Sequence, residues 1–209
     1  MLSILFSIIL GYALGNIQFA VLLSKAVAKD DIRNHGSGSA GTTNMLRSFG
    51  VKLGVLTFAG DVFKGAVAYV LCRYVLGGTQ LGEWCGVLGG IFVIVGHNWP
   101  ILYRFKGGKG IASSFGVALV INPIVAVILL VVALLTAFIT KFMSLGSLLG
   151  AILVGLYGLF FQPWPTALLF IAIMVLGIWQ HRGNIVKLVH GNENKIFTSA
   201  PEVKRRNLK

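Results

Sequence analysis

The chain has 209 residues, of which 56% are hydrophobic and only 11% are charged. A soluble domain carries about 25% charged residues, so this chain has too little polar surface to cover a core in water. Because helices satisfy their own backbone hydrogen bonds in lipid, and because the apolar runs are long rather than short and alternating, we expect an all-α integral membrane protein and not a barrel.

The formal net charge is +12. Nucleic acid is one partner of basic proteins, but polytopic membrane proteins also collect Lys and Arg in their cytoplasmic loops. The hydropathy favours the second reading, and we expect no nucleic-acid partner. Cys72 and Cys85 lie in or beside apolar runs without the spacing of metal ligands, so we expect packed thiols, no metal site and no cofactor.

Apolar runs that reach or approach bilayer length lie at about 2–24, 51–73, 81–99, 110–121, 124–140, 145–161 and 164–181. The first run lacks a basic n-region and reads as a retained span. The run at 110–121 is short for a full crossing and starts on a glycine-rich loop. Asn122-Pro123 and Gln162-Pro163 are breakers between later runs. We therefore predict a seven-span bundle over 1–195, followed by a basic cytoplasmic tail at 196–209.

The basic residues predict the orientation of these spans. Nearly all of them fall in one alternate set of connections: 25–50, 100–109, the turn at Lys141 and the tail from 182. The other set, 74–80, 122–123 and 162–163, holds none, with Arg73 at its border. Positive loops stay in the cytoplasm, so we predict an outside N-terminus and a cytoplasmic C-terminus.

Three polar segments then share the cytoplasmic face, and the first is 33–47. Its glycines permit tight turns, its hydroxyl and amide groups, including Ser37 and Asn44, offer hydrogen bonds, and Arg47 offers a planar fork suited to phosphate. An anion site and an ordinary flexible loop both fit this pattern.

The second segment, 96–114, contains His97 and then Gly107, Gly108, Lys109 and Gly110 directly before an apolar run. Bare backbone N–H groups that open into a helix N-terminus can bind an anion, and a lysine can reach the same anion. The alternative is a positive-inside loop that uses glycine for turning. His97 is equally well explained as a core residue or a site residue.

The third segment, 181–195, contains His181, Asn184 and Lys187, which share one face if the last helix continues, and Glu193 beyond them. A histidine beside an asparagine could orient or deprotonate a hydroxyl. The alternative is a solvated tail that anchors to lipid headgroups.

Asp61 and Lys64 lie inside the second run, where charges are costly and face a polar interior. They could pair to fix helix packing or contact a substrate. With six acidic residues in the chain, little carboxylate chemistry is available. The residues instead favour positive charge, N–H dipoles and one histidine acting on an activated substrate that carries phosphate.

Together these segments resemble the bacterial acyl-phosphate-dependent glycerol-3-phosphate acyltransferase family, also called the PlsY family. The resemblance runs from the first span to Lys195. The matching residues are Gly36, Ser37, Gly38, Gly41, Thr43, Asn44, Arg47, Asp61, Lys64, Gly65, Gly96, His97, Pro100, Phe105 to Gly110, His181, Asn184, Ile185, Leu188, Gly191 and Glu193. Ser39 and Lys187 depart from the usual asparagine and arginine.

The resemblance implies a seven-span enzyme of the bacterial plasma or inner membrane. It implies transfer of a fatty acyl group from acyl phosphate to the 1-hydroxyl of glycerol 3-phosphate, which is the first acylation step of phospholipid synthesis. Loop 107–110 would then bind acyl phosphate. Ser37, Arg47 and Lys109 would hold glycerol 3-phosphate, and His181 and Asn184 would orient its hydroxyl.

The resemblance also names partners: membrane lipid around the acyl chain, and the enzyme that makes acyl phosphate. The alternative function is a transporter of a phosphorylated solute, which the same basic segments and the Asp61–Lys64 pair would suit. Transporters place their site near mid-membrane between repeated halves, and the sequence shows no convincing internal repeat.

Overall fold

The computed structural model describes residues 1–78 and 81–196, and its regular structure is entirely helical. The α-helices are α1 (Leu2–Gly15), α2 (Phe19–Ala28), α3 (Thr42–Phe49), α4 (Val51–Val70), α5 (Gly82–Asn98), α6 (Ile111–Ile121), α7 (Pro123–Thr140), α8 (Met143–Phe161), α9 (Trp164–Gln180) and α10 (Arg182–Val189). Short turns of helix are η1 (Ile32–Asn34), the π-helical η2 (Leu71–Leu76) and η3 (Ile101–Tyr103). The all-α prediction is confirmed, whereas the predicted tail lies, apart from Ile196, outside the described residues.

Five segments of the described chain are long and apolar enough to cross a membrane: Leu2–Ala28, Val51–Leu76, Gly82–Tyr103, Pro123–Thr140 and Met143–Phe161. Helix α9 passes the same test together with α10, from which it is bent by 56°. Helix α6 is apolar but shorter. These segments correspond to the seven predicted runs, and the number of complete crossings stays a prediction.

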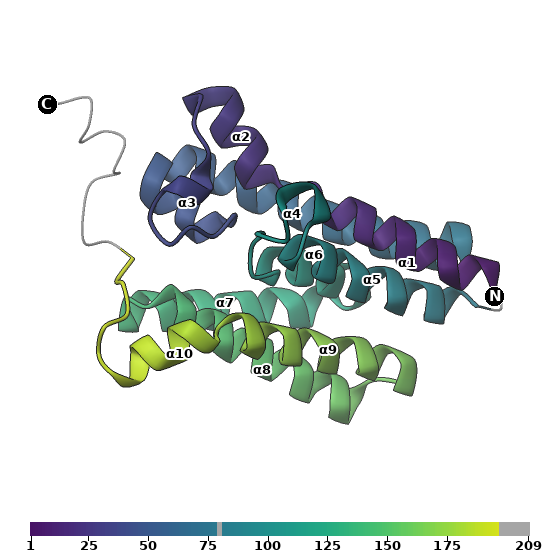
Figure 1. The fold of residues 1–209 in the computed structure, drawn as a ribbon. Coiled ribbons are helices and arrows are strands. Elements are labelled where there is room, and N and C mark those ends of the chain that lie inside the picture. Colours follow the sequence, from purple (N-terminus) through teal and green to yellow (C-terminus); the bar gives the residue numbers. More distant parts are fainter. Residues whose placement is uncertain (79–80, 197–209) are drawn as a thin grey trace, which may run out of the picture.

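The helices form two groups (Figure 1). Helices α1, α4, α5 and α6 pack together, α7, α8 and α9 form the second group, and contacts of α5 with α9 and of α6 with α7 join them. Small residues bring the helices of the first group close. A Cβ on Gly11 would lie 2.5 Å from the Gly89 carbonyl oxygen, and one on Gly116 would lie 2.0 Å from that of Val62.

The first apolar run is broken between α1 and α2, which the sequence did not predict. Gln18 is extended there, and the break leaves backbone carbonyls without helical partners. Lys64 Nζ donates to the carbonyl oxygens of Ile17 at 2.6 Å and Gly15 at 3.3 Å. A buried lysine on α4 therefore satisfies a helix break that lipid could not.

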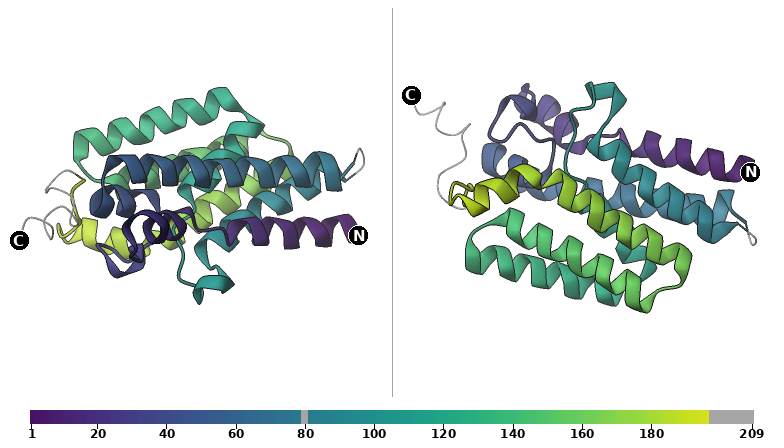
Figure 2. Two further views of the ribbon diagram at one scale, coloured as in Figure 1. Left: turned by 90° about the horizontal axis from the view of Figure 1, so that it is seen from above. Right: turned by 60° about the horizontal axis from the view of Figure 1, so that its bottom comes forward.

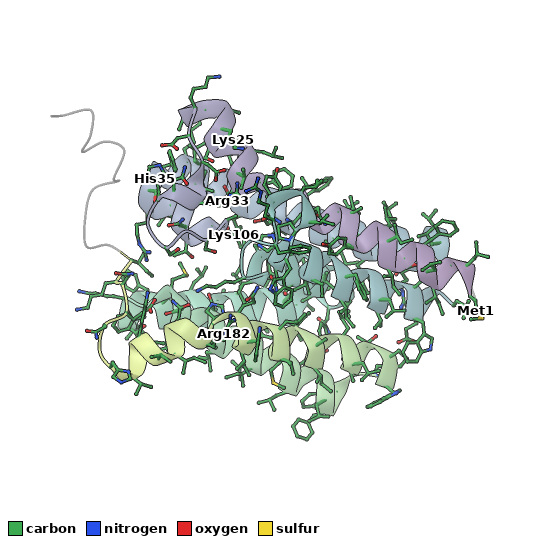
Figure 3. The ribbon with its side chains drawn as sticks, in the orientation of Figure 1. Met1, Lys25, Arg33, His35, Lys106 and Arg182 are labelled. Carbon is green, nitrogen blue, oxygen red and sulfur yellow. The ribbon has the colours of Figure 1, made fainter. Side chains whose placement is uncertain are left out.

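The N-terminus and α10 lie at opposite ends of the bundle, as the views in Figure 2 agree. Figure 3 shows labelled basic side chains displaced from Met1 toward the other end: Lys25, Arg33, Lys106 and Arg182. This distribution is what the positive-inside prediction requires. The orientation of the bundle in a bilayer stays a prediction.

Candidate active site

A cavity of about 440 Å³ lies between the two groups of helices, with polar walls toward the basic end. Helix α3 and the loop before it, α4, the loop before α6, and α10 with the chain after it all contribute to it. The polar lining includes Ser37, Asn44, Arg47, Asp61, His97, Lys109, His181, Asn184, Lys187 and Glu193. Residues from three distant polar segments thus share one space.

The first loop is shaped by Asn44. Its side-chain nitrogen donates to the backbone oxygens of His35 and Ser39, both at 3.0 Å, and its Oδ1 accepts from the Ser37 N–H at 3.1 Å. Gly36 has a φ of +54°, and a Cβ there would meet Asn44 Oδ1 at 2.3 Å. Asn44 therefore positions the loop, while Arg47, one turn later on α3, extends a half-buried guanidinium into the cavity.

The second loop packs tightly against the end of α5. The Gly108 N–H donates to the His97 carbonyl oxygen at 3.1 Å, and the Ala40 N–H donates to that of Gly107 at 3.2 Å. A Cβ on Gly107 would lie 2.0 Å from the His97 carbonyl oxygen, so this approach requires glycine. Gly107 and Gly108 form the part of the loop that packs against α5, and they are not among the cavity-lining residues.

The same loop leads into α6 and places the N-terminus of this helix at the cavity wall. Gly110 has a φ of +82° and is the N-cap residue, and no side chain caps this helix start. The first N–H groups of α6 therefore lack a side-chain acceptor and carry the positive end of the helix dipole. Gly110, Ile111 and Ala112 line the cavity, which gives it an anion-binding wall.

In the third segment, Glu193, Asn184 and Lys109 form a chain of hydrogen bonds. Asn184 Nδ2 donates to Glu193 Oε1 at 2.8 Å, which turns Asn184 Oδ1 toward the ammonium of Lys109, its donor. His181 follows α9, is 2% exposed, and donates from Nδ1 to the Gly177 carbonyl oxygen at 2.8 Å, because a carbonyl can only accept. Its Nε2 is therefore an acceptor.

The electrostatics favour an anion in this cavity. Burial, opposed by Glu193 and reinforced by Lys187 and Arg47, lowers the pKa of Lys109 to about 8. Burial and the charge of Lys109 also lower the pKa of His181, which favours a neutral imidazole. Neither Arg47 nor Lys187 forms an ion pair with any residue in 1–78 or 81–196. Two unpaired cations beside a third are stabilised by bound negative charge.

Asp61, Lys64 and His97 form a buried cluster at the inner end of the polar wall. Lys64 Nζ lies 2.8 Å from Asp61 Oδ1 and 2.8 Å from His97 Nδ1. Asp61 and His97 line the cavity, whereas Lys64 lies behind them at the α1–α2 break. The pair predicted from the sequence is therefore formed, and it includes His97.

Beyond the polar groups, the cavity continues as an apolar branch between α4, α6, α7, α8 and α9. Its lining includes Val55, Phe58, Phe115, Ala118, Ala126, Leu129, Leu130, Ala133, Leu134, Ala151, Val154 and Ile173. Val55 and Leu134 are 56% and 49% exposed, so this branch opens sideways toward lipid. One space thus joins a cationic compartment to an apolar one.

The sequence reasoning missed two polar lining residues, Ser144 and Ser147, which lie in the first turns of α8. Thr42 and Thr43, which also line the cavity at the start of α3, belong to the first polar segment. Serine in an apolar helix carries no distinctive signal, so only the fold could place the pair on α8. Among the residues that the structure describes, no group of His, Cys, Asp or Glu side chains could hold a metal ion.

Comparison with known proteins agrees with this geometry. Residues 5–191 match the glycerol-3-phosphate acyltransferase family. A protein of that name from Finegoldia magna is 44% identical over 200 residues, covering 93% of this chain and 98% of the relative. Another from Neisseria meningitidis is 40% identical over 193 residues, covering 91% and 96%.

Two crystal structures of PlsY, described as an integral membrane glycerol 3-phosphate acyltransferase, share the fold. Its glycerol 3-phosphate form has a TM-score of 0.85 and 34% identity, covering 94% of this chain and 96% of that one. Its lysophosphatidic acid form has a TM-score of 0.82 and 33% identity, covering 92% and 95%. The chain described here therefore belongs to the glycerol-3-phosphate acyltransferase family of integral membrane enzymes.

Proposed function

We propose that this protein transfers a fatty acyl group from acyl phosphate to the 1-hydroxyl of glycerol 3-phosphate, releasing lysophosphatidic acid and inorganic phosphate. The observation that carries this proposal is the convergence of Arg47, Lys109 and Lys187 on a cavity whose other branch is apolar and open to lipid. The cationic part of the cavity suits the phosphates of the two substrates, and the apolar branch suits the acyl chain. The two substrates share a single space, as a direct transfer requires.

The donor site is assigned to loop 107–110 and the N-terminus of α6. The uncapped N–H groups beyond Gly110 suit the phosphate of the donor. From there the acyl chain extends into the apolar branch past Phe58 and Phe115. A fatty chain buried there gains about 0.8 kcal/mol for each CH₂ removed from water.

The acceptor site is assigned to Ser37, Arg47 and Lys109, which would hold the phosphate of glycerol 3-phosphate. Arg47 provides a bidentate fork and Lys109 a point charge. His181 Nε2 then accepts the hydrogen bond of the 1-hydroxyl, and Asn184, fixed by Glu193, orients the same group.

The reaction is a single acyl transfer. The hydroxyl oxygen of glycerol 3-phosphate attacks the acyl carbonyl carbon, a C–O ester bond forms, and the C–O bond to phosphate breaks. The hydroxyl proton leaves its hydrogen bond to His181 Nε2 and passes to the leaving phosphate, which has oxygens available to accept it. Negative charge grows on that phosphate, where the α6 N-terminus and Lys109 stabilise it. The product leaves sideways into lipid.

Acyl phosphate is a reactive mixed anhydride with a long apolar chain, so free diffusion through water is a poor route to this site. The enzyme that makes acyl phosphate is therefore the proposed partner, delivering its product at the cytoplasmic membrane surface.

The test uses purified protein in phospholipid nanodiscs. We expect phosphate release from acyl phosphate only when glycerol 3-phosphate is present, and no replacement of the donor by acyl-CoA. Lys109→Ala and Arg47→Ala should each lose about 100-fold in kcat/KM, as expected for removal of a charged contact. Lys52→Ala, which changes an exposed lysine outside the cavity, should retain activity. Release without acceptor, equal use of acyl-CoA, or full activity in both site variants would contradict the proposal.

A further inference from the structure

The contact between Lys64 and His97 determines more than helix packing. Both side chains are buried, at 2% and 3% exposure. Lys64 Nζ lies 2.6 Å from the Ile17 carbonyl oxygen and 2.8 Å from Asp61 Oδ1, in addition to its 2.8 Å contact with His97 Nδ1. The Asp61 carboxylate is buried, and a buried charge is paired with an opposite one, so we assign Lys64 as the ammonium of an ion pair with Asp61. His97 Nδ1 also lies 3.5 Å from Asp61 Oδ1, a distance longer than a normal hydrogen bond.

The ammonium fixes the tautomer of His97. An ammonium group has three donors and no acceptor, so His97 Nδ1 must accept the hydrogen bond from Lys64. The ring nitrogen that accepts cannot also carry the proton in a neutral imidazole. The proton of His97 therefore resides on Nε2.

His97 Nε2 lies beside the glycine-rich loop. A Cβ on Gly108 would approach it to 2.2 Å, and the Gly108 N–H is bonded to the His97 backbone oxygen. His97 lines the cavity, and its Nε2 has no hydrogen-bond partner in the part of the chain that the structure describes. A ligand oxygen in the cavity would supply the acceptor that this N–H donor lacks.

We infer that Lys64 is a positioning residue that holds His97 as its Nε2–H tautomer, and that this N–H donates to the phosphate bound at loop 107–110. The identity of that phosphate, the leaving group of the acyl donor, rests on the proposed function. The donor then acts where negative charge grows as the C–O bond breaks. His181, which donates from Nδ1 to the Gly177 carbonyl, has the opposite free nitrogen and serves the hydroxyl instead.

The tautomer can be read directly by ¹⁵N NMR of histidine-labelled protein in nanodiscs, with the His97 signals assigned from a His97→Gln sample. We expect a protonated Nε2 and an unprotonated Nδ1, and a shift of the Nε2–H signal upon addition of inorganic phosphate. Lys64→Met should remove the preference for this tautomer. A proton on Nδ1, or an unchanged Nε2 signal at phosphate concentrations that inhibit turnover, would overturn the inference.

Kinetics provide the second measurement. His97→Leu removes the donor and should lower kcat about 100-fold, the usual cost of one preorganised donor, with a smaller change in the KM for glycerol 3-phosphate. His97→Gln, which returns an N–H near the same place, should recover part of that loss. Equal activity of His97→Leu and wild type overturns the inference while leaving the proposed function intact. A wild-type protein without acyl transfer refutes the proposed function, and the tautomer measurement still stands by itself.

Discussion

Lys109 is the side chain on which both proposed phosphate sites depend. It lies within the glycine-rich loop 107–110, and its ammonium contacts Asn184 in the third segment. Lys109 can lose its proton at mildly basic pH, because burial lowers its pKa to about 8. Arg47, whose guanidinium stays charged at any working pH, does not share this sensitivity.

We therefore expect a basic limb in the pH profile of kcat/KM. Lys109 is an ammonium below pH 8 and loses its charge above it, so affinity for phosphate should fall up to tenfold per pH unit in the free enzyme. The measurement is the initial rate at low substrate from pH 6 to 10.

Lys109→Arg separates this cause from others, since arginine does not titrate in that range. The limb should disappear in this variant even if its overall rate is lower, while the exposed Lys52→Arg should keep it. A limb that persists in Lys109→Arg would assign the titration to another group.

At the scale of elements, the site depends on a loop that fits against its neighbours without room for a side chain. A Cβ on Gly108 would lie 2.2 Å from His97 Nε2 and 2.9 Å from the Ala40 carbonyl oxygen. The first and second loops meet there, so a shift of one displaces the other.

Gly108→Ala should accordingly lose about 100-fold in activity, because a displacement of about 1 Å in a positioned group can cost that much. The matched substitution is Gly183→Ala on α10, where a Cβ meets nothing within 4 Å. That variant should keep its activity and have an equal or slightly higher Tm, since alanine favours helix over glycine. Comparable losses in the two variants would show that fit around Gly108 is not the cause.

The sequence predicts the elements well where local chemistry decides them. Asn122 and Pro123 end one helix and begin another as expected, with Asn122 Oδ1 accepting from the Val125 N–H at 3.1 Å. The break at 16–18 could not be read locally, because the Ile17 carbonyl oxygen accepts from Lys64, which is distant in sequence. Within the described chain, only the Gly15 carbonyl oxygen of this break has a local side-chain donor, Gln18 Nε2 at 3.0 Å. Helix α3 was hidden for a different reason, since its glycine N-cap and threonine start resemble an ordinary loop.

The same distinction holds for the site. The three polar segments could be recognised because polar residues are conspicuous in an apolar chain, and Ser37, Arg47, Lys109 and His181 do share one cavity. Whether each lines the cavity or supports it depends on packing. Gly107 and Gly108 pack against His97 and do not line the cavity, whereas Asn44 is occupied in shaping the first loop, which residue type alone does not reveal.

At the scale of the whole molecule, charge and shape are both asymmetric. The polar compartment lies toward the basic end, and the apolar branch runs from it between the two groups of helices. Under the proposed function, water-soluble glycerol 3-phosphate would enter from one side of the membrane, and the acyl donor and product would exchange with lipid through the side opening near Val55 and Leu134. This division of routes works only if the basic end faces the cytoplasm.

That orientation can be tested with single cysteines, because the native Cys72 and Cys85 are buried. Pro163→Cys lies at an exposed turn of the end predicted to be outside, and Lys141→Cys lies at an exposed turn of the opposite end. A membrane-impermeant maleimide that reaches the outer face of the plasma membrane should label Pro163→Cys in intact cells, and should label Lys141→Cys only after the membrane is permeabilised. Labelling of both in intact cells, or the reverse pattern, would place the cationic compartment on the wrong side for a cytoplasmic substrate.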